Sequence, residues 1–199
     1  MKTILLAEDE SIVRKGLRAI IVDSLQYKQV DETENCNGIM ESLKKKNFSH
    51  AIFDIRLGKE QVIEVLPNIQ QLYPTLHIAV LSAQQPNLYL TLLESYGVSK
   101  FIKKSDPEPD VVSGISHFLN NEPGKLYEGE LKAMPFDGLT PREVEVLHYI
   151  LQGMRQTEIA ARLAISTGSV FKYLTRIYEK TGVENEKQLW ELARIYNVG

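Results

Sequence analysis

The sequence predicts an α/β domain built on a mostly parallel sheet, followed by a smaller all-α module. Three observations support this organisation. Over residues 1–120, short apolar runs alternate five times with amphipathic stretches, the pattern of a parallel sheet with helices on both faces. Over residues 121–137 the pattern lapses into a linker-like segment with prolines, glycines and mixed charges. Over residues 138–199 apolar residues recur at helical spacing.

The elements of the first domain follow from its apolar runs. The runs "TILLA", "HAIFDI" and "LHIAVLSA" have the length and burial pattern of strands, "KQVDET" is a weaker strand signal, and "KFIKK" is a last short strand. The expected strands cover residues 3–7, 28–33, 50–55, 76–83 and 100–104. Amphipathic stretches between them predict helices over residues 11–25, 39–46, 60–72, 88–96 and 109–119.

Four helices are predicted in the second segment, and three of them carry cap signals. "LTPREVEVLHYILQG" has Thr140 at the N-cap, Pro141 at the first helical position and Glu143 three residues after the cap, which is a capping box. Ser166 is the expected cap of the third helix and Asn185 of the fourth. The short connection "LAIST" between the second and third helices suits a helix-turn-helix.

Size and composition exclude several classes of protein. The 199 residues are 43% hydrophobic and 25% charged, as in ordinary globular proteins. No apolar run approaches the ~20 residues of a membrane span, and the N-terminus becomes acidic too early for a secretory signal. The one cysteine, Cys36, excludes an internal disulfide framework and a Cys-rich metal motif. We therefore expect a cytoplasmic protein that does not associate with membranes.

The net charge of −3 is unevenly distributed. Residues 139–199 contain eight Lys or Arg and seven Asp or Glu, whereas the rest of the chain is acidic. Between Arg155 and Lys180, five basic residues stand against two acidic ones. Such a segment suits a polyanion such as nucleic acid, and on charge alone it equally suits a solvated helix face.

Polar side chains gather where the predicted strands end. Glu8 and Asp9 follow the first strand, and Asp54 ends the third. Ser82 ends the fourth strand and Lys104 the fifth. Because the carboxyl ends of parallel strands meet at one edge of a sheet, these groups should converge. Clustered carboxylates repel one another unless a cation lies among them, and Mg²⁺ binds through one or two carboxylates plus phosphate oxygens. A carboxylate in such a site can act as a nucleophile on a phosphoryl group.

Each residue also has a simpler interpretation. Asp9 could cap the helix that begins near residue 11, Asp54 could be a turn residue, and Lys104 could be exposed at the end of an edge strand. The combination of these residues with the order of strands and helices favours the phosphoryl-transfer site.

Residues 1–120 resemble the receiver domain of two-component response regulators. The resemblance rests on "LLAEDE", "AIFDIRLG", "IAVLSA" and "GVSKFIKK". It implies a flavodoxin-like, five-stranded parallel sheet of order 2-1-3-4-5. It also implies that Asp54 accepts a phosphoryl group from a sensor histidine kinase or a small phosphodonor. Ser82 and Lys104 would hold the phosphoryl oxygens, and Phe101 would be the aromatic switch residue.

The resemblance further implies a Mg²⁺ site made by Glu8, Asp9, Asp54 and the backbone carbonyl of Arg56. Three features depart from the family pattern. Leu57-Gly58 replaces the usual Met-Pro, which predicts a more mobile loop. Glu8 replaces the commoner Asp, so its carboxylate lies one methylene further out. Arg56 lies where side chains shield or expose the acyl phosphate.

The third helix of the second segment has one apolar and one polar face. Val170, Leu174 and Ile177 form an apolar stripe, and the opposite face carries basic and hydroxyl side chains that suit a major groove. The order "LTPREVEVLHYILQG…TEIAARLAIS…SV…YLTRIYEKTGV" resembles the LuxR-type (NarL/FixJ) helix-turn-helix over residues 139–199. That module follows a receiver in a large class of response regulators.

This resemblance assigns the recognition helix to about residues 167–181 and a homodimer contact, made on activation, to residues 188–195. Phe171 stands where the family usually has Lys or Arg, and Tyr173 where His is frequent. Phenylalanine cannot make a bidentate contact with guanine, but it can pack against a thymine methyl group. The residues expected to contact double-stranded DNA are Thr157, Ser169, Phe171, Lys172, Thr175, Arg176 and Lys180.

The sequence thus predicts a response regulator in which phosphorylation of Asp54 controls dimerisation and sequence-specific DNA binding, and thereby transcription. Two alternatives stay open. A haloacid-dehalogenase-like phosphatase would also use an aspartyl phosphate, but it has a second Asp where this chain has Arg56, so we expect no enzyme. In the other alternative, the helical module binds a protein instead of DNA.

Overall fold

The structure is a computed structural model that describes every residue except 1, 84–86, 130, 132, 197 and 199. The chain forms two compact units. The first contains residues 1–83 and 96–128, and the second contains residues 84–95 and 129–199. Within the described part of the chain, every helix is too short or too polar to cross a lipid bilayer.

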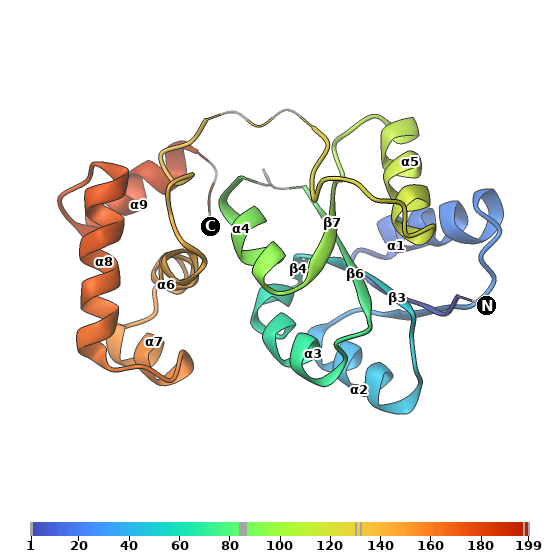
Figure 1. The fold of residues 1–199 in the computed structure, drawn as a ribbon, viewed down its shortest axis with the longest axis horizontal. Helices are drawn as coiled ribbons and strands as arrows, with labels where there is room; N and C mark the ends of the chain where they lie inside the picture. The colour runs from blue at the N-terminus through green and yellow to red at the C-terminus, as the bar shows by residue number, and fades with distance from the viewer. Residues whose placement is uncertain (1, 84–86, 130, 132, 197, 199) are drawn as a thin grey trace. The chain divides into compact units, whose positions relative to one another are not determined.

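The first unit is built on a five-stranded sheet in which every neighbouring pair is parallel (Figure 1). The strand order is β2-β1-β3-β6-β7. Because β6 and β7 are the fourth and fifth strands of this sheet, this is the predicted order 2-1-3-4-5. The strands are β1 (Ile4–Ala7), β2 (Val30–Thr33), β3 (His50–Asp54), β6 (His77–Ser82) and β7 (Val98–Lys103).

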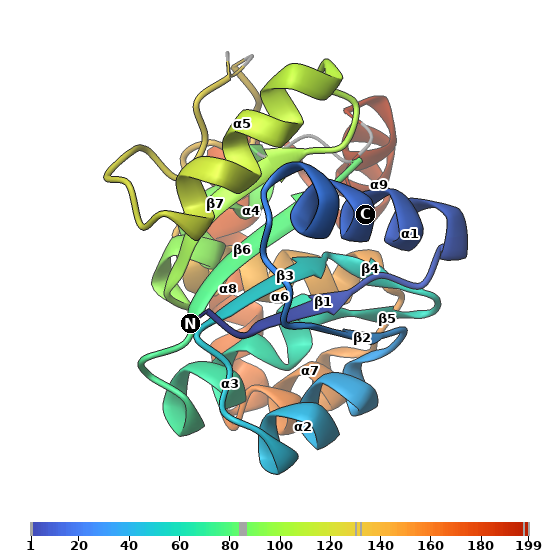
Figure 2. The ribbon, with the colours of Figure 1, turned by 90° about the vertical axis from the view of Figure 1, so that its right-hand side faces the viewer.

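Helices cover both faces of this sheet, with α1 and α5 on one face and α2 and α3 on the other (Figure 2). On the first face, Leu6, Ile52 and Leu81 from three central strands belong to one buried cluster with Leu17 of α1 and Ile115 of α5. The helices are α1 (Ser11–Ala19), continued by a π-helical turn η1 (Ile20–Ser24), α2 (Cys36–Lys45), α3 (Leu66–Leu72) and α5 (Glu108–Leu119).

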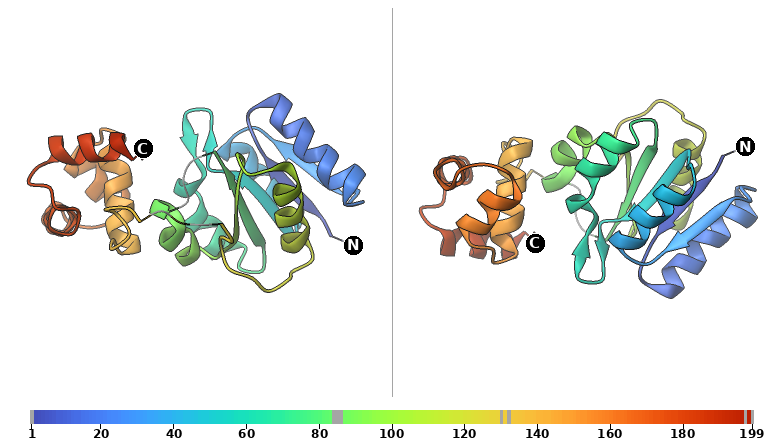
Figure 3. Two further views of the ribbon diagram at one scale, coloured as in Figure 1. Left: turned by 90° about the horizontal axis from the view of Figure 1, so that it is seen from above. Right: turned by 90° about the horizontal axis from the view of Figure 1, so that it is seen from below.

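The chain between β3 and α3 differs from the single helix predicted over residues 60–72. Two short strands form an antiparallel ribbon outside the main sheet (Figure 3). Gly58 lies in the turn of this ribbon with a φ of +64°, a conformation that glycine adopts at little cost. The elements in this stretch are β4 (Arg56–Leu57), β5 (Glu60–Gln61) and a 3₁₀ turn, η2 (Val62–Glu64).

The second unit is helical, and its predicted caps are present. The Thr140 hydroxyl accepts a hydrogen bond from the Glu143 amide, and the Glu143 carboxylate accepts one from the Thr140 amide at 2.8 Å. Ser166 and Asn185 cap the two later helices through their side chains. The helices of this unit are α4 (Asn87–Ser95), α6 (Pro141–Leu151), α7 (Gln156–Arg162), α8 (Thr167–Thr181) and α9 (Glu186–Ile195).

Helix α4 groups with the C-terminal helices, which no sequence signal indicated. The ring of Tyr89 meets the ring of His148 on α6 edge-on, with centroids 5.9 Å apart, and the Tyr89 hydroxyl lies 3.4 Å from His148 Nδ1. Burial lowers the pKa of His148 to about 4, and the charge of Arg162 acts in the same direction. His148 is therefore a neutral, buried packing residue at pH 7.

The segment over residues 121–137, predicted to be a linker, is divided between the two units. Its first part, through Glu128, belongs to the first unit and lies beside β7 (Figure 2). There the Phe101 amide donates a hydrogen bond to the Leu126 carbonyl at 2.6 Å. Its later part belongs to the second unit, where Phe136 is buried. The precise domain boundaries, at residues 120 and 138, stay predictions.

Candidate functional site

The residues predicted to converge do lie at one edge of the main sheet. Glu8 and Asp9 follow β1, Asp54 is the last residue of β3, and Ser82 is the last residue of β6. Lys104 follows β7, and its amide donates a hydrogen bond to the Ser82 carbonyl at 2.8 Å. The parallel pairing of β3 with β6 and of β6 with β7 therefore fixes the relative positions of these side chains.

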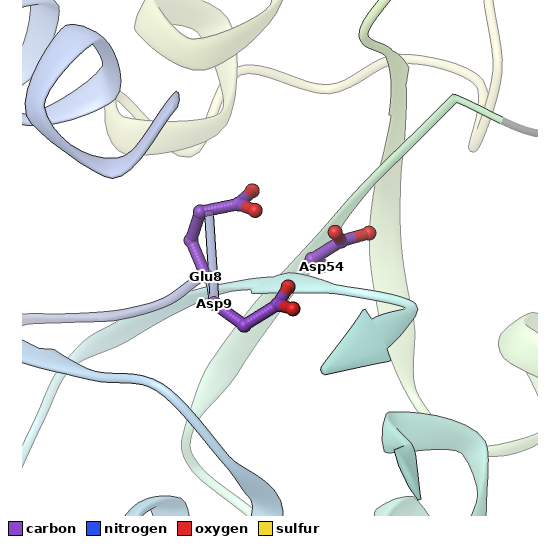
Figure 4. A group of neighbouring side chains, drawn as sticks. All are labelled: Glu8, Asp9 and Asp54. Atoms are coloured by element: carbon purple, nitrogen blue, oxygen red, sulfur yellow. The ribbon is translucent and has the colours of Figure 1, made fainter. Parts of the chain in front are cut away.

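The three carboxylates form a tight cluster (Figure 4). Glu8, Asp9 and Asp54 each offer an oxygen, and these oxygens all lie within 4.8 Å of one another. Glu8 and Asp54 are buried, whereas Asp9 is half-buried. Converging carboxylate oxygens are the ligands that a hard divalent cation takes, so this donor set fits such an ion.

Lys104 bridges two of these acids. Its Nζ lies 2.5 Å from Glu8 Oε2 and 2.7 Å from Asp54 Oδ2. Burial lowers the pKa of Lys104, but its hydrogen bonds to Asp54 and Glu8 outweigh burial and raise it overall. Burial raises the pKa of both Asp54 and Glu8, and the contact with Lys104 offsets only part of that effect. The ammonium therefore supplies the positive charge that lets two buried acids stay close together.

The structure decides between the simpler interpretations of these residues. Asp9 does not cap α1, because Glu10 occupies the N-cap position. Asp9 Oδ2 instead accepts a hydrogen bond from the Gly58 amide at 3.0 Å. The side chain of Lys104 is only 15% exposed, so it does not project freely from the sheet. Asp54 does have a turn-like contact, since its Oδ1 accepts from the Arg56 amide at 3.3 Å.

The replacement of Met-Pro by Leu57-Gly58 gives the loop a specific contact. Proline has no amide proton, whereas the Gly58 amide binds the Asp9 carboxylate. Leu57 is buried, and the β4–β5 ribbon pairs Arg56 with Gln61. The contact with Asp9 ties the tip of this ribbon to the acid cluster, where the sequence predicted greater mobility.

Sequence reasoning missed Arg14, which holds the backbone of the acid pair. Its Nη1 donates to the Glu8 carbonyl at 2.7 Å and lies 3.4 Å from the Asp9 carbonyl. On its other side it pairs with Glu34 at 2.6 Å and Glu32 at 3.4 Å. The sequence showed only that a basic residue stands in the first turn of the helix after the acid pair. Its role could be inferred only from the structure, in which β2 lies beside β1.

Ser82 and Phe101 lie deeper in the unit. Each is 2% exposed, and Phe101 is paired with Val80 in the sheet. The ring of Tyr127 meets the Phe101 ring edge-on, with centroids 5.7 Å apart. The predicted switch residue is therefore buried and in contact with the segment that follows α5.

In the second unit, α8 buries its apolar stripe and exposes most of the predicted DNA-contacting side chains. Val170, Leu174 and Ile177 are buried, and Phe171 is 62% exposed. The Thr175 hydroxyl donates to the Phe171 carbonyl at 3.1 Å, so it is used within the helix. The other exposed members of the predicted set are Lys172, Thr175, Arg176 and Lys180 on α8 and Thr157 on α7.

Two predicted DNA contacts are engaged inside the unit. Lys180 Nζ lies 2.6 Å from Oε2 of Glu143, a residue only 2% exposed. Burial raises the pKa of Glu143, but the hydrogen bonds from Lys180 and Thr140 outweigh it and lower the pKa overall. Ser169 is half-buried and its hydroxyl lies 2.9 Å from the Ser166 hydroxyl. Both contacts secure the ends of α8.

Helix α9, predicted to form a dimer contact, carries exposed apolar side chains. Trp190 is 40% exposed, Ile195 71% and Tyr196, just after the helix, 37%. Of these side chains, Trp190 lines a surface hollow of about 440 Å³ together with Leu151 and Val198. Exposed aromatic and aliphatic groups around a hollow are features of protein–protein contact surfaces.

Comparison with known proteins identifies both parts of the chain. Residues 4–116 match the model of the response regulator receiver domain, and residues 137–193 match that of bacterial regulatory proteins of the luxR family. The receiver match covers more than half of the chain.

Relatives with the same organisation extend over nearly the whole chain. The transcription regulator BvgA of Bordetella pertussis is 23% identical over an alignment of 205 positions that covers 98% of each chain. The response regulator UvrY of Escherichia coli is 23% identical and covers 97% of this chain and 94% of its own. The fold is also that of RcsB from Salmonella enterica serovar Typhimurium, solved on promoter rprA with the phosphomimetic BeF3−, at a TM-score of 0.73, 22% identity and 98% coverage of both chains. The chain therefore belongs to the response regulator family, as a receiver domain joined to a luxR-family DNA-binding module that regulates transcription.

Proposed function

We propose that phosphorylation of Asp54 controls dimerisation and DNA binding by this regulator. The observation that carries the proposal is the Lys104 bridge between Asp54 and Glu8. A phosphoryl group on Asp54 would replace a single negative charge by about −1.5 to −2 and add acceptor oxygens. Lys104 would then exchange a carboxylate partner for a phosphoryl oxygen, and this exchange gives two states with different contacts.

The residues at the sheet edge have separate parts in the transfer. An Asp54 carboxylate oxygen forms a bond to phosphorus while the bond from phosphorus to the donor, a histidine kinase or a small phosphodonor, breaks. Glu8, Asp9, Asp54 and the Arg56 carbonyl would hold Mg²⁺, which supplies positive charge to the transferring oxygens. The Lys104 ammonium and the Ser82 hydroxyl would donate hydrogen bonds to those oxygens.

The DNA contact is proposed for the exposed face of α8. Lys172 and Arg176 supply the cationic groups, and the exposed Phe171 and Thr175 directly precede them in the sequence. Because Lys180 and Ser169 already have partners within the unit, they rank as weaker candidates for contact with DNA. Two copies of α8 would be presented together through the apolar surface around Trp190 on α9.

The test compares Asp54→Asn with the unmodified chain. DNA fragments are first selected from a random-sequence pool with Mg²⁺ and beryllofluoride, and affinity is then measured by fluorescence anisotropy, with the mass in solution measured by sedimentation. Beryllofluoride should raise affinity roughly tenfold or more and produce a dimer. Asp54→Asn should show neither effect, whereas Asp23→Asn, which alters an exposed carboxylate on η1, should show both. An equal gain in the Asp54→Asn variant would refute the proposal.

A further inference from the structure

Residues 122–128, named here the edge strap, contact β7 in three different ways. The Phe101 amide donates to the Leu126 carbonyl at 2.6 Å. The Phe101 ring meets the Tyr127 ring at an interplanar angle of 89°. Lys100 Nζ lies 3.1 Å from Glu128 Oε1 and 3.4 Å from the Lys125 carbonyl. Main chain, ring and charge thus all join the strap to residues 100 and 101 of β7.

The ion pair of Lys100 with Glu128 holds the strap against β7. The Lys100 side chain is only 10% exposed although it belongs to an edge strand. Glu128 Oε1 also accepts a hydrogen bond from the Lys125 amide at 3.1 Å, a contact between residues three apart within the strap. The hydrogen bond from Lys100 lowers the pKa of Glu128, so its carboxylate is charged at neutral pH. A partly buried ammonium needs such a partner, and this requirement fixes where the strap lies.

Tyr127 is the strap residue whose ring contacts the ring of the predicted switch residue Phe101. Phe101 is 2% exposed. Tyr127 is partly buried, and this burial raises the pKa of its phenol, an effect to which the nearby charge of Asp106 adds. Lys104 lies three residues beyond Phe101 and directly follows β7, so an exchange of its partners acts on the end of that strand. The strap continues along the sequence into the luxR-family module.

We propose that the edge strap is a coupling element in which Tyr127 and Glu128 are positioning residues that act through Phe101 and Lys100. The strap holds Phe101 buried, tightens when the acceptor site takes a phosphoryl group, and transmits that state to the chain leading into the DNA-binding module. This inference rests on the proposed control of DNA binding by Asp54.

The first measurement is amide exchange at Phe101 with Mg²⁺, with and without beryllofluoride. The Phe101 amide reports the strap directly, because its hydrogen bond goes to Leu126. Exchange should slow when beryllofluoride binds. An unchanged or faster exchange would overturn the proposal. This readout does not require DNA binding, so it still decides the role of the strap if the full-length chain shows no gain in DNA affinity, the result that would refute the proposed function.

The second measurement uses variants of the strap in the full-length chain. Tyr127→Ala should take up phosphoryl groups normally but lose part of the gain in DNA affinity, on the order of fivefold, the contribution expected of an edge-to-face aromatic pair. Tyr127→Phe keeps the ring and should behave like the unmodified chain. Lys125→Ala, which removes an exposed side chain from the same segment, should also keep the full gain. Glu128→Gln should reduce the gain because it removes the charge opposite Lys100.

Two outcomes would count against the coupling role. If Tyr127→Ala retains the full gain, the aromatic contact carries no signal. If Tyr127→Ala instead fails to take up the phosphoryl group, the strap is a structural part of the acceptor domain and the proposal is wrong. Rescue by Tyr127→Phe separates a specific ring contact from general loss of structure.

Discussion

Replacing Lys104 by methionine should destabilise the first unit, because it removes the ammonium that separates two buried carboxylates. The two contacts that it breaks measure 2.5 and 2.7 Å. The side chain of Glu8 is 1% exposed and that of Asp54 is 10% exposed, so water cannot fully replace the lost partner. Hydrogen bonds to charged groups contribute about 1.5–3 kcal/mol each, and breaking a buried ion pair costs about 3–5 kcal/mol. Because Lys104 is itself partly exposed, we expect a loss of about 3 kcal/mol at pH 7.

The sign of the pH dependence follows from the directions of the pKa shifts. The pKa of Lys104 is raised above 10.5, so its stabilising contribution is complete below that pH and is lost as pH rises through the raised value. The pKa values of Glu8 and Asp54 are raised above 4.5 and 3.8, so both acids take up protons readily as the pH falls. Neutral acids no longer need the ammonium. The difference between Lys104→Met and the unmodified chain should therefore be largest near neutral pH and shrink in acid.

The assay is urea-dependent hydrogen exchange of the β1 and β3 amides, which reports the first unit without contribution from the second. Lys103→Met is the matched control, since it removes a neighbouring ammonium outside the cluster, and its effect should stay within about 0.5 kcal/mol. Millimolar Mg²⁺ should restore part of the stability of Lys104→Met by placing a cation among the same carboxylates. If Lys104→Met matched the unmodified chain at pH 7 without Mg²⁺, the ammonium would not be what holds the cluster together.

Three further predictions each test single contacts. Arg14→Met should weaken Mg²⁺ binding about tenfold, as loss of a residue that positions metal ligands commonly does, and isothermal titration would expose the error if affinity were unchanged. Arg176→Met should lower the slope of log affinity against log salt by about one, as expected for a lost phosphate contact. Lys180→Met should leave that slope unchanged but lower the midpoint of unfolding, followed by Trp190 fluorescence. Equal slopes for both variants would contradict this assignment. We expect Phe171 to pack against a thymine methyl group, so replacing the thymines of the selected site one at a time by uracil should weaken binding about fourfold at one position. The same replacement should have no effect on binding by Phe171→Ala, and an equal loss in that variant would contradict the expected contact.

The features that sequence predicted best depend on local patterns. The cap at Thr140 and the cap at Asn185 were predictable because each involves residues three apart on one helix. The meeting of Glu8 with Asp54 was predictable because the parallel order places strand ends together, whatever the details of packing.

The features that sequence missed depend on contacts between distant residues. The β4–β5 ribbon replaced the start of a predicted helix, and it is tied down by the contact of Gly58 with Asp9, 49 residues away. The burial of Lys100 depends on Glu128, which lies in a stretch without periodicity. Arg14 gained its role from Glu32 on the neighbouring strand β2 and from Glu34 just after that strand. None of these contacts leaves a periodic signal in the sequence.

Because the strap covers the outer edge of β7, the point at which the chain is truncated should matter. A receiver fragment ending at residue 120 would keep every helix and strand of the main sheet but expose the Phe101 amide, which Leu126 now satisfies. A fragment ending at residue 128 would keep that amide occupied. An exposed edge strand with unpaired backbone groups can pair with another chain. The shorter fragment should therefore self-associate, while the longer one stays monomeric. The eight residues 121–128, which look like a connector in the sequence, are therefore expected to keep the edge of the receiver from pairing with other chains.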